Sequence, residues 1–118
     1  MDLWHLPVAP TALYYDPKLD MEGSRKCTLT LFFEDNDFNS KELKLSFLGV
    51  EKFCFTYLTS LNSEMRGAYG KVILIYDSAL IEEIRSLNNN KIELNHYMIT
   101  FDDGPCYEFI CKKFIEQD

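Results

Sequence analysis

Histidine and cysteine side chains near the end of this 118-residue sequence are the residue types best suited to nucleophilic catalysis. His96 begins one alternating apolar segment, and Cys106 and Cys111 lie on the next such segment. A catalytic histidine needs both a nucleophile and a third group that orients its ring. With two histidines and four cysteines in the chain, proximity in sequence arises easily by chance. We therefore interpret His96 as a structural residue and the two thiols as buried and unreactive.

Carboxylates are concentrated in two short segments. Glu34, Asp35 and Asp37 resemble part of a calcium-binding loop, but the glycine and the distal glutamate that such a loop needs are missing. Asp102 and Asp103 are adjacent at an expected hairpin turn, where exposure removes the pKa difference that paired catalytic carboxylates require. We therefore expect no catalytic residue, no metal and no cofactor. The five carboxylates are instead candidate contacts for a cationic partner.

The overall charge narrows the class of partner. Nineteen acidic and twelve basic residues give a formal net charge of −7, which argues against nucleic acids and anionic membrane surfaces. The sequence contains no glycine-rich phosphate loop, no GxSxG and no HExxH. Aromatic residues make up 14% of the chain, more than a small core can bury completely. We expect a basic protein partner, with Tyr97, Tyr107 and Trp4 as candidate anchors.

Targeting signals are not expected in this sequence. The first seven residues have neither a basic start nor a long apolar run, so they do not resemble a signal peptide. No stretch approaches the ~18 consecutive apolar residues of a membrane-spanning helix. We therefore expect a cytoplasmic protein whose four cysteines are free thiols.

Alternation of apolar and polar residues predicts a β-rich fold of the α+β class. It predicts strands over residues 25–34, 42–47 and 52–58, with Gly49 in the link between the last two. A continuous apolar run over residues 71–76 predicts a central strand that is buried on both faces.

Helical spacing of apolar residues predicts one main helix. Leu80, Ile84 and Leu87 repeat at this spacing over residues 78–88, and Ser78 is placed to cap the helix. Residues 59–70 are ambiguous, because the segment contains both a possible cap and two glycines.

A C-terminal β-hairpin is predicted over residues 95–114. A two-residue Asp-Gly turn would place apolar residues opposite polar ones, whereas a three-residue loop would place Phe101 opposite Tyr107 and keep the apolar faces together. We choose the three-residue loop because it agrees with the side-chain pattern.

These elements predict one domain over residues 1–118. Its six or seven strands are expected to form a mostly antiparallel curled sheet with the main helix packed on it. Residues 1–22 contain three prolines and are expected to be an irregular segment packed on the body, with a possible short edge strand over residues 12–15.

Two segments resemble a known class of small bacterial proteins. Residues 42–55, ELKLSFLGVEKFCF, resemble a strand–Gly-Val–strand pattern, and residues 96–110, HYMITFDDGPCYEFI, resemble the closing hairpin of such proteins. The class comprises immunity proteins encoded beside secreted polymorphic toxins, together with relatives of no assigned function. The resemblance implies a cytosolic protein that neutralises a toxin, and many toxins of this kind are basic nucleases.

Three functions follow in order of preference. The first is a non-catalytic protein-binding domain, most concretely an immunity protein. The second is a small-molecule binding or catalytic domain with a pocket under the curled sheet that is lined by Phe and Tyr and into which polar groups such as His96 and Glu108 converge. The third is a self-associating structural module that pairs through edge strands at residues 12–15 or 106–114. Lys112 and Lys113 oppose edge pairing, so a monomer or a weak dimer is expected.

Overall fold

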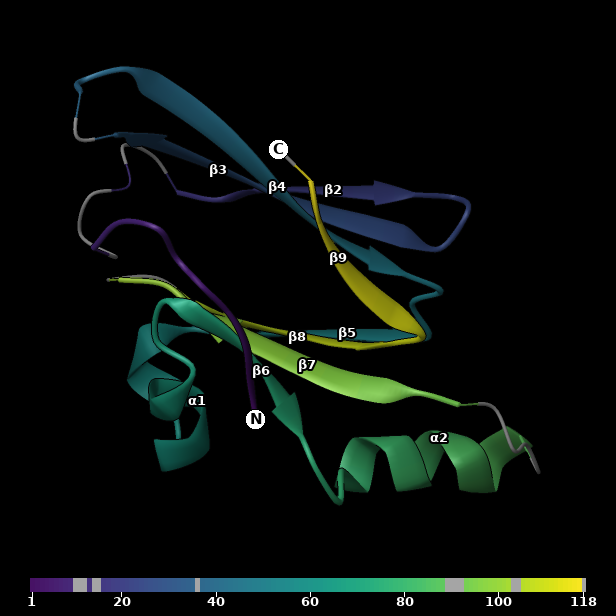
Figure 1. The fold of residues 1–118 in the computed structure, drawn as a ribbon. Helices are drawn as coiled ribbons and strands as arrows, with labels where there is room; N and C mark the ends of the chain where they lie inside the picture. The colour runs from purple at the N-terminus through teal and green to yellow at the C-terminus, as the bar shows by residue number, and fades with distance from the viewer. Residues whose placement is uncertain (10–12, 14–15, 36, 89–92, 103–104, 118) are drawn as a thin grey trace.

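Two β-sheets and two α-helices make up the described part of the computed structural model (Figure 1). The structure describes residues 1–9, 13, 16–35, 37–88, 93–102 and 105–117. One sheet has five strands in the order β1 (Asp2–His5), β6 (Lys71–Ile75), β7 (Asn95–Thr100), β8 (Cys106–Cys111) and β5 (Lys52–Thr56). The other has four strands in the order β2 (Lys18–Glu22), β3 (Lys26–Glu34), β4 (Ser40–Leu48) and β9 (Lys113–Gln117). All strand pairs within the two sheets are antiparallel.

An apolar core fills the space between the two sheets. Alternation along β3 and β4 turns Leu29, Leu31, Leu45 and Phe47 inward, and all four side chains are completely buried. The Phe47 ring stacks on Phe109 of β8 with ring centroids 3.9 Å apart. This contact joins the middle of one sheet to the middle of the other, so the sheets are held face to face.

The β-rich, mostly antiparallel α+β class is confirmed, but the expectation of one curled sheet with six or seven strands is wrong in detail. Nine strands occur within the described residues, in two sheets. Gly49 has a φ of +68° in the link between β4 and β5, which belong to different sheets. A second crossing occurs at Lys112, whose N–H donates to the carbonyl of Leu48 at 2.9 Å. Alternation shows that one face of a strand is buried, but it does not show which sheet covers that face.

The N-terminal segment also differs from the expectation of an irregular chain over residues 1–22. It contains β1, which pairs with β6, and β2, which pairs with β3. Both strands lie at sheet edges, where a short segment between prolines needs partners on one side only. Leu13 forms an isolated bridge with Phe33, while the rest of the edge strand expected over residues 12–15 lies outside the described residues.

The C-terminal hairpin is present as β7 and β8, but its register differs from the predicted one. Tyr107 lies opposite Ile99, whereas the predicted three-residue loop would place it opposite Phe101. The Phe101 N–H donates instead to the carbonyl of Pro105 at 3.3 Å. A shift of two residues leaves every side chain on the same face, so the apolar pattern fits both registers equally.

The edge predicted over residues 106–114 is also corrected by the structure. β8 lies between β7 and β5, so its backbone is paired on both sides. The chain then continues into β9, which forms an edge of the four-stranded sheet.

The main helix is α2 (Ala79–Asn88), which agrees with the prediction over residues 78–88. The Ser78 Oγ accepts a hydrogen bond from the N–H of Ile81 at 3.2 Å, as expected for a cap. Ile81 packs with Leu94 and with Ile110 of β8. The helix therefore covers the outer face of the five-stranded sheet (Figure 1).

The ambiguous segment over residues 59–70 is partly helical. It contains a 3₁₀ turn, η2 (Leu58–Ser60), and the short helix α1 (Ser63–Gly67). Asn62 caps α1, because its side-chain oxygen accepts from the N–H of Met65 at 2.9 Å. None of the helices in the described ranges is long and apolar enough to cross a membrane.

Candidate functional site

The two predicted acidic turns lie at the same end of the molecule. The β3–β4 turn and the β7–β8 turn both point toward the left of Figure 1. Asp37 and Phe38 are exposed in the first turn, and the Phe38 side chain is 81% exposed. Asp102 is half-buried in the second turn, next to Tyr69 at 42% exposure. We call these four residues the hairpin end: Asp37, Phe38, Tyr69 and Asp102.

Asp35 builds the β3–β4 turn. Its Oδ1 accepts hydrogen bonds from the N–H groups of Asp37 and Asn39 at 2.9 and 3.0 Å, and Lys41 Nζ lies 3.7 Å from Oδ2. The Asn39 N–H is the largest cause of a lowered pKa at Asp35. Asp35 therefore holds the turn in shape and stays charged to lower pH than an ordinary aspartate, while half-buried Glu34 precedes it at the end of β3.

The second turn is fixed to the loop before β6. The Tyr69 hydroxyl donates to Asp102 Oδ1 at 2.6 Å, so an exposed ring and a carboxylate are held side by side. Asp16 adds another carboxylate near this end, because its charge helps raise the pKa of Tyr107 on β8, although burial is the larger cause. Asp103 lies outside the described residues.

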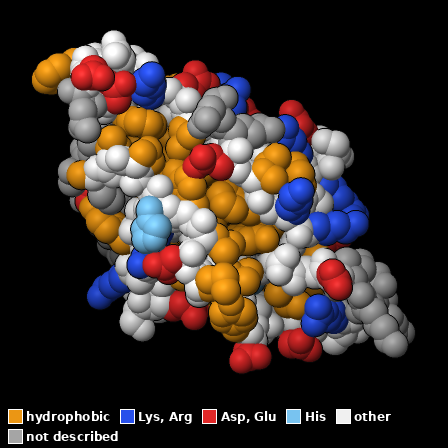
Figure 2. Space-filling view, viewed as in Figure 1, with side chains coloured by type: hydrophobic (Ala, Val, Ile, Leu, Met, Phe, Trp, Pro, Cys, Tyr) orange, Lys and Arg blue, Asp and Glu red, His pale blue; other side chains and the backbone are white. Residues whose placement is uncertain are grey.

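Basic side chains gather at the opposite end of the sandwich. The Val50 N–H donates to the carbonyl of Arg25 at 2.9 Å, which joins the β2–β3 turn to the β4–β5 link. The β8–β9 corner lies beside this link, because the Lys112 side chain contacts Gly49. The basic residues of this corner are Arg25, Lys26, Lys52, Lys112 and Lys113. Two of them are ion-paired, Arg25 with Glu51 at 2.7 Å and Lys52 with Glu83 at 3.9 Å. Figure 2 shows acidic side chains beside a basic one at the β3–β4 corner, and a group of Lys and Arg side chains with acidic side chains among them at the other end.

The predicted aromatic anchors do not share the hairpin end. Tyr97 and Tyr107 are 7% and 5% exposed and belong to the core between the sheets. Trp4 on β1 is half-buried and packs against the same core. The exposed rings at the hairpin end include Phe38 and Tyr69 instead. The burial of Tyr97 and Tyr107 shows that alternation identifies a face of a strand but does not show that a second sheet covers it.

Three buried polar side chains are hydrogen-bonded in series on the outer face of the five-stranded sheet, the face that carries α2. The Ser78 Oγ is 2.8 Å from His96 Nδ1, and His96 Nε2 is 2.8 Å from Glu108 Oε1. The three residues come from the start of α2, from β7 and from β8, and all are buried. The structure thus brings His96 and Glu108 together, but both are buried and neither is among the residues that line the pocket beside Ser78. In the sequence, Ser78 is marked only by its position as a helix cap.

The thiols near His96 have no nucleophilic character. Burial raises the pKa of Cys106 and of Cys111 to about 12. Both are therefore protonated at neutral pH, and the two side chains lie on opposite faces of β8. The four cysteines are free. Within the described ranges, no cluster of three or more His, Cys, Asp or Glu residues is arranged to hold a metal ion.

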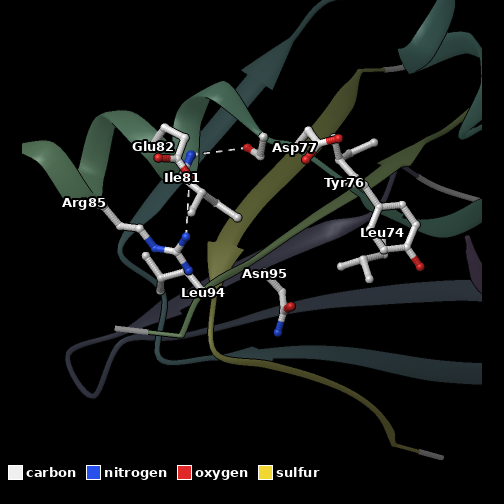
Figure 3. Close-up of a pocket in the computed structure, with 10 residues that line it drawn as sticks. Leu74, Tyr76, Asp77, Ile81, Glu82, Arg85, Leu94 and Asn95 are labelled. Carbon is white, nitrogen blue, oxygen red and sulfur yellow. Dashed lines mark hydrogen bonds and ion pairs between the residues drawn. The ribbon is translucent and has the colours of Figure 1, made fainter. Parts of the chain in front are cut away.

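A pocket of about 250 Å³ lies beside Ser78 (Figure 3). Leu74, Ile81 and Leu94 provide apolar walls, and Arg85 lies 3.5 Å from Glu82 on the adjoining turn of α2. The pocket lies on the helix side of the five-stranded sheet, away from the hairpin end.

Comparison with protein-family models, with curated proteins and with solved structures found no match to this chain. The two candidate sites are therefore the hairpin end and the buried Ser78, His96 and Glu108 with the pocket beside Ser78.

Proposed function

We propose that this chain is a protein-binding domain that neutralises a basic protein toxin, in the manner of the immunity proteins that its sequence resembles. The observation that supports the proposal is the separation of charge along the molecule. Carboxylates and exposed rings lie at the hairpin end, whereas the opposite corner carries five basic residues, of which Arg25 and Lys52 are ion-paired with Glu51 and Glu83. Such a separation attracts a basic partner and orients it toward one end.

The hairpin end has the composition of a protein-binding surface. Phe38 has a φ of +61°, which is unusual for a large residue, and its side chain makes almost no contribution to the core. Burial of such a side chain against a partner is worth about 1.5–3 kcal/mol. The nearby carboxylates would mainly raise the association rate, whereas the rings would slow dissociation.

The proposed contacts follow from these positions. Asp37, Phe38, Tyr69 and Asp102 contact the partner, while Asp35 maintains the turn, and Glu34 and Asp16 add negative potential. Tyr97 and Tyr107 are not included because they are buried. The proposal places the protein in the cytoplasm as a monomer, and binding at this surface needs no metal or cofactor.

Neutralisation in cells tests the proposal. The probe is the protein encoded by the gene immediately upstream, expressed from an inducible promoter with or without this chain. We expect that protein to stop growth alone and growth to resume when the chain is present. The variant Asp37→Lys/Phe38→Ser should fail to restore growth, because both changes affect exposed side chains of the contact surface.

The matched control is Glu22→Lys, which changes one exposed charge on β2 near the opposite end. It should restore growth as well as the unchanged chain does. An upstream protein that is harmless, or equal protection by all three forms, would contradict the proposed function.

A further inference from the structure

Ser78 occupies a sharp turn between a strand and a helix. β6 ends at Ile75, and α2 begins at Ala79. Between them Asp77 has a φ of +53°, which is strained for a residue with a side chain. The turn places the Ser78 side chain at the amino end of α2, where helical N–H groups favour negative charge. Ser78 lies on the helix side of the five-stranded sheet, away from the hairpin end.

Hydrogen-bond directions give Ser78 a base. Its Oγ already accepts from the Ile81 N–H, so its own proton is free to point at His96 Nδ1, 2.8 Å away. His96 Nδ1 then accepts, and Nε2–H donates to Glu108 Oε1 at 2.8 Å. Serine, histidine and a carboxylate are thus linked in the order that activates a serine nucleophile. The ring is turned relative to serine proteases, since Nδ1 rather than Nε2 faces the serine.

Capping of α2 by Ser78 does not by itself require the hydrogen bonds that link Ser78, His96 and Glu108. A capping serine needs only an oxygen that accepts from the helix, and it can do so while solvent satisfies its hydroxyl. Here a histidine and a glutamate are both buried to complete the chain, although burying polar groups is costly. Ser78 also lines the 250 Å³ pocket, which gives a small molecule a place beside its side chain.

We propose that Ser78 is an activated nucleophile that accepts short acyl groups from small esters. The Ser78 Oγ bonds to the ester carbonyl carbon as its proton passes to His96 Nδ1. The bond to the alcohol oxygen breaks, and the alcohol leaves with that proton. Water then attacks the acyl-serine, releasing a carboxylic acid and restoring the Ser78 hydroxyl. Glu108 is a positioning residue, and the pocket that would hold the acyl group has both apolar side chains (Leu74, Ile81 and Leu94) and charged ones (Asp77, Glu82 and Arg85) in its lining.

A fluorophosphonate probe tests the nucleophile directly. Serine attack forms an Oγ–P bond and releases fluoride, and mass spectrometry of peptides locates the adduct. We expect stoichiometric labelling of Ser78 in the folded chain and slow release of acetate from p-nitrophenyl acetate. Ser86→Ala, a change to an exposed serine on the same helix, should label at the unchanged rate.

Two variants separate reactivity from folding. Ser78→Asn keeps a capping oxygen and should remain folded but lose the adduct. Glu108→Gln keeps a hydrogen-bond acceptor and should lower the labelling rate at least about tenfold, because the carboxylate no longer stabilises the protonated ring. Failure to label Ser78 in the unchanged folded chain, or equal labelling rates in the unchanged and Glu108→Gln chains, overturns the proposal.

Discussion

His96 links two elements on the outer face of the five-stranded sheet. Its ring is hydrogen-bonded to Ser78 at the start of α2 and to Glu108 on β8. Ser78 is 6% exposed, His96 5% and Glu108 7%. Because the site is buried, water cannot replace a lost partner there.

We predict that His96→Leu lowers the free energy of unfolding by about 2–4 kcal/mol, because Ser78 and Glu108 each lose a buried hydrogen-bond partner. Urea unfolding followed by tryptophan fluorescence measures the change. His5→Leu is the matched control, because His5 is exposed on β1 and should shift the value by less than about 0.5 kcal/mol. Equal stability of the two variants would show that the buried chain contributes nothing.

The cysteines give a second prediction at the same scale. With pKa values of about 12, Cys106 and Cys111 should remain unmodified by iodoacetamide at pH 8 in the folded chain, whereas half-buried Cys54 should react first. Peptide mass spectrometry after timed exposure measures the three rates. Modification of either buried thiol as fast as Cys54 would contradict the burial.

The same pKa shifts give the stability a pH dependence of definite sign. An unfolded thiol loses its proton above about pH 8.5, whereas the folded one keeps it to about pH 12. The folded state therefore binds more protons in this window, and stability falls as the pH rises through it. Urea midpoints at pH 8 and pH 10 should show the decrease, and replacing both cysteines by alanine should reduce it. If the alanine variant loses as much stability between pH 8 and pH 10 as the unchanged chain, the assignment of the pH dependence to Cys106 and Cys111 is contradicted.

Links between elements decide which sheet each strand joins. Gly49 is the clearest case, because it combines a φ of +68° with the crossing from β4 to β5. A Cβ at this position would lie 2.9 Å from Lys112 Cγ, on the other link that crosses between the sheets.

We predict that Gly49→Ala lowers the free energy of unfolding by about 1–2 kcal/mol, the usual cost of a side chain in the left-handed region. Gly23→Ala is the control, because an added Cβ there meets nothing within 4 Å, and its effect should stay within about 0.5 kcal/mol. Chemical unfolding of both variants makes the comparison. A neutral Gly49→Ala would mean that the link relaxes without cost.

The sequence patterns determine the elements better than their assembly. Alternation located β3, β4, β5, β7 and β8, and helical spacing located α2, because each pattern follows from one buried face. The register of β7 on β8 was wrong because a two-residue slip preserves that face. The division into two sheets was missed because it is decided at Gly49 and Lys112, where no periodicity exists.

The candidate sites were predictable to a different extent. The acidic turns could be recognised from local residues, but their placement at one end depends on how two separate hairpins stack. Burial of Tyr97 and Tyr107 followed from a second sheet that alternation does not reveal. The chain from Ser78 to Glu108 joins residues 30 positions apart through sheet pairing, so no local motif announces it.

Exposed acidic side chains and a group of Lys and Arg side chains are concentrated at different ends of the molecule, which has a net charge of −7, although Arg25 and Lys52 of the basic group are ion-paired with Glu51 and Glu83. A uniform negative surface would attract a basic partner to any side, whereas this distribution favours approach by the hairpin end. Attraction of this kind acts on the rate of association and weakens as salt screens the charges.

The most direct test is the association rate of the purified upstream-encoded protein with this chain, measured by stopped-flow fluorescence across a range of salt. The rate should fall at least about tenfold between low salt and about 0.5 M. Asp37→Lys combined with Asp102→Asn should slow association and flatten its dependence on salt, while Glu22→Lys should change neither. A rate that is independent of salt, or equally affected by charge changes at both ends, would contradict binding through the hairpin end.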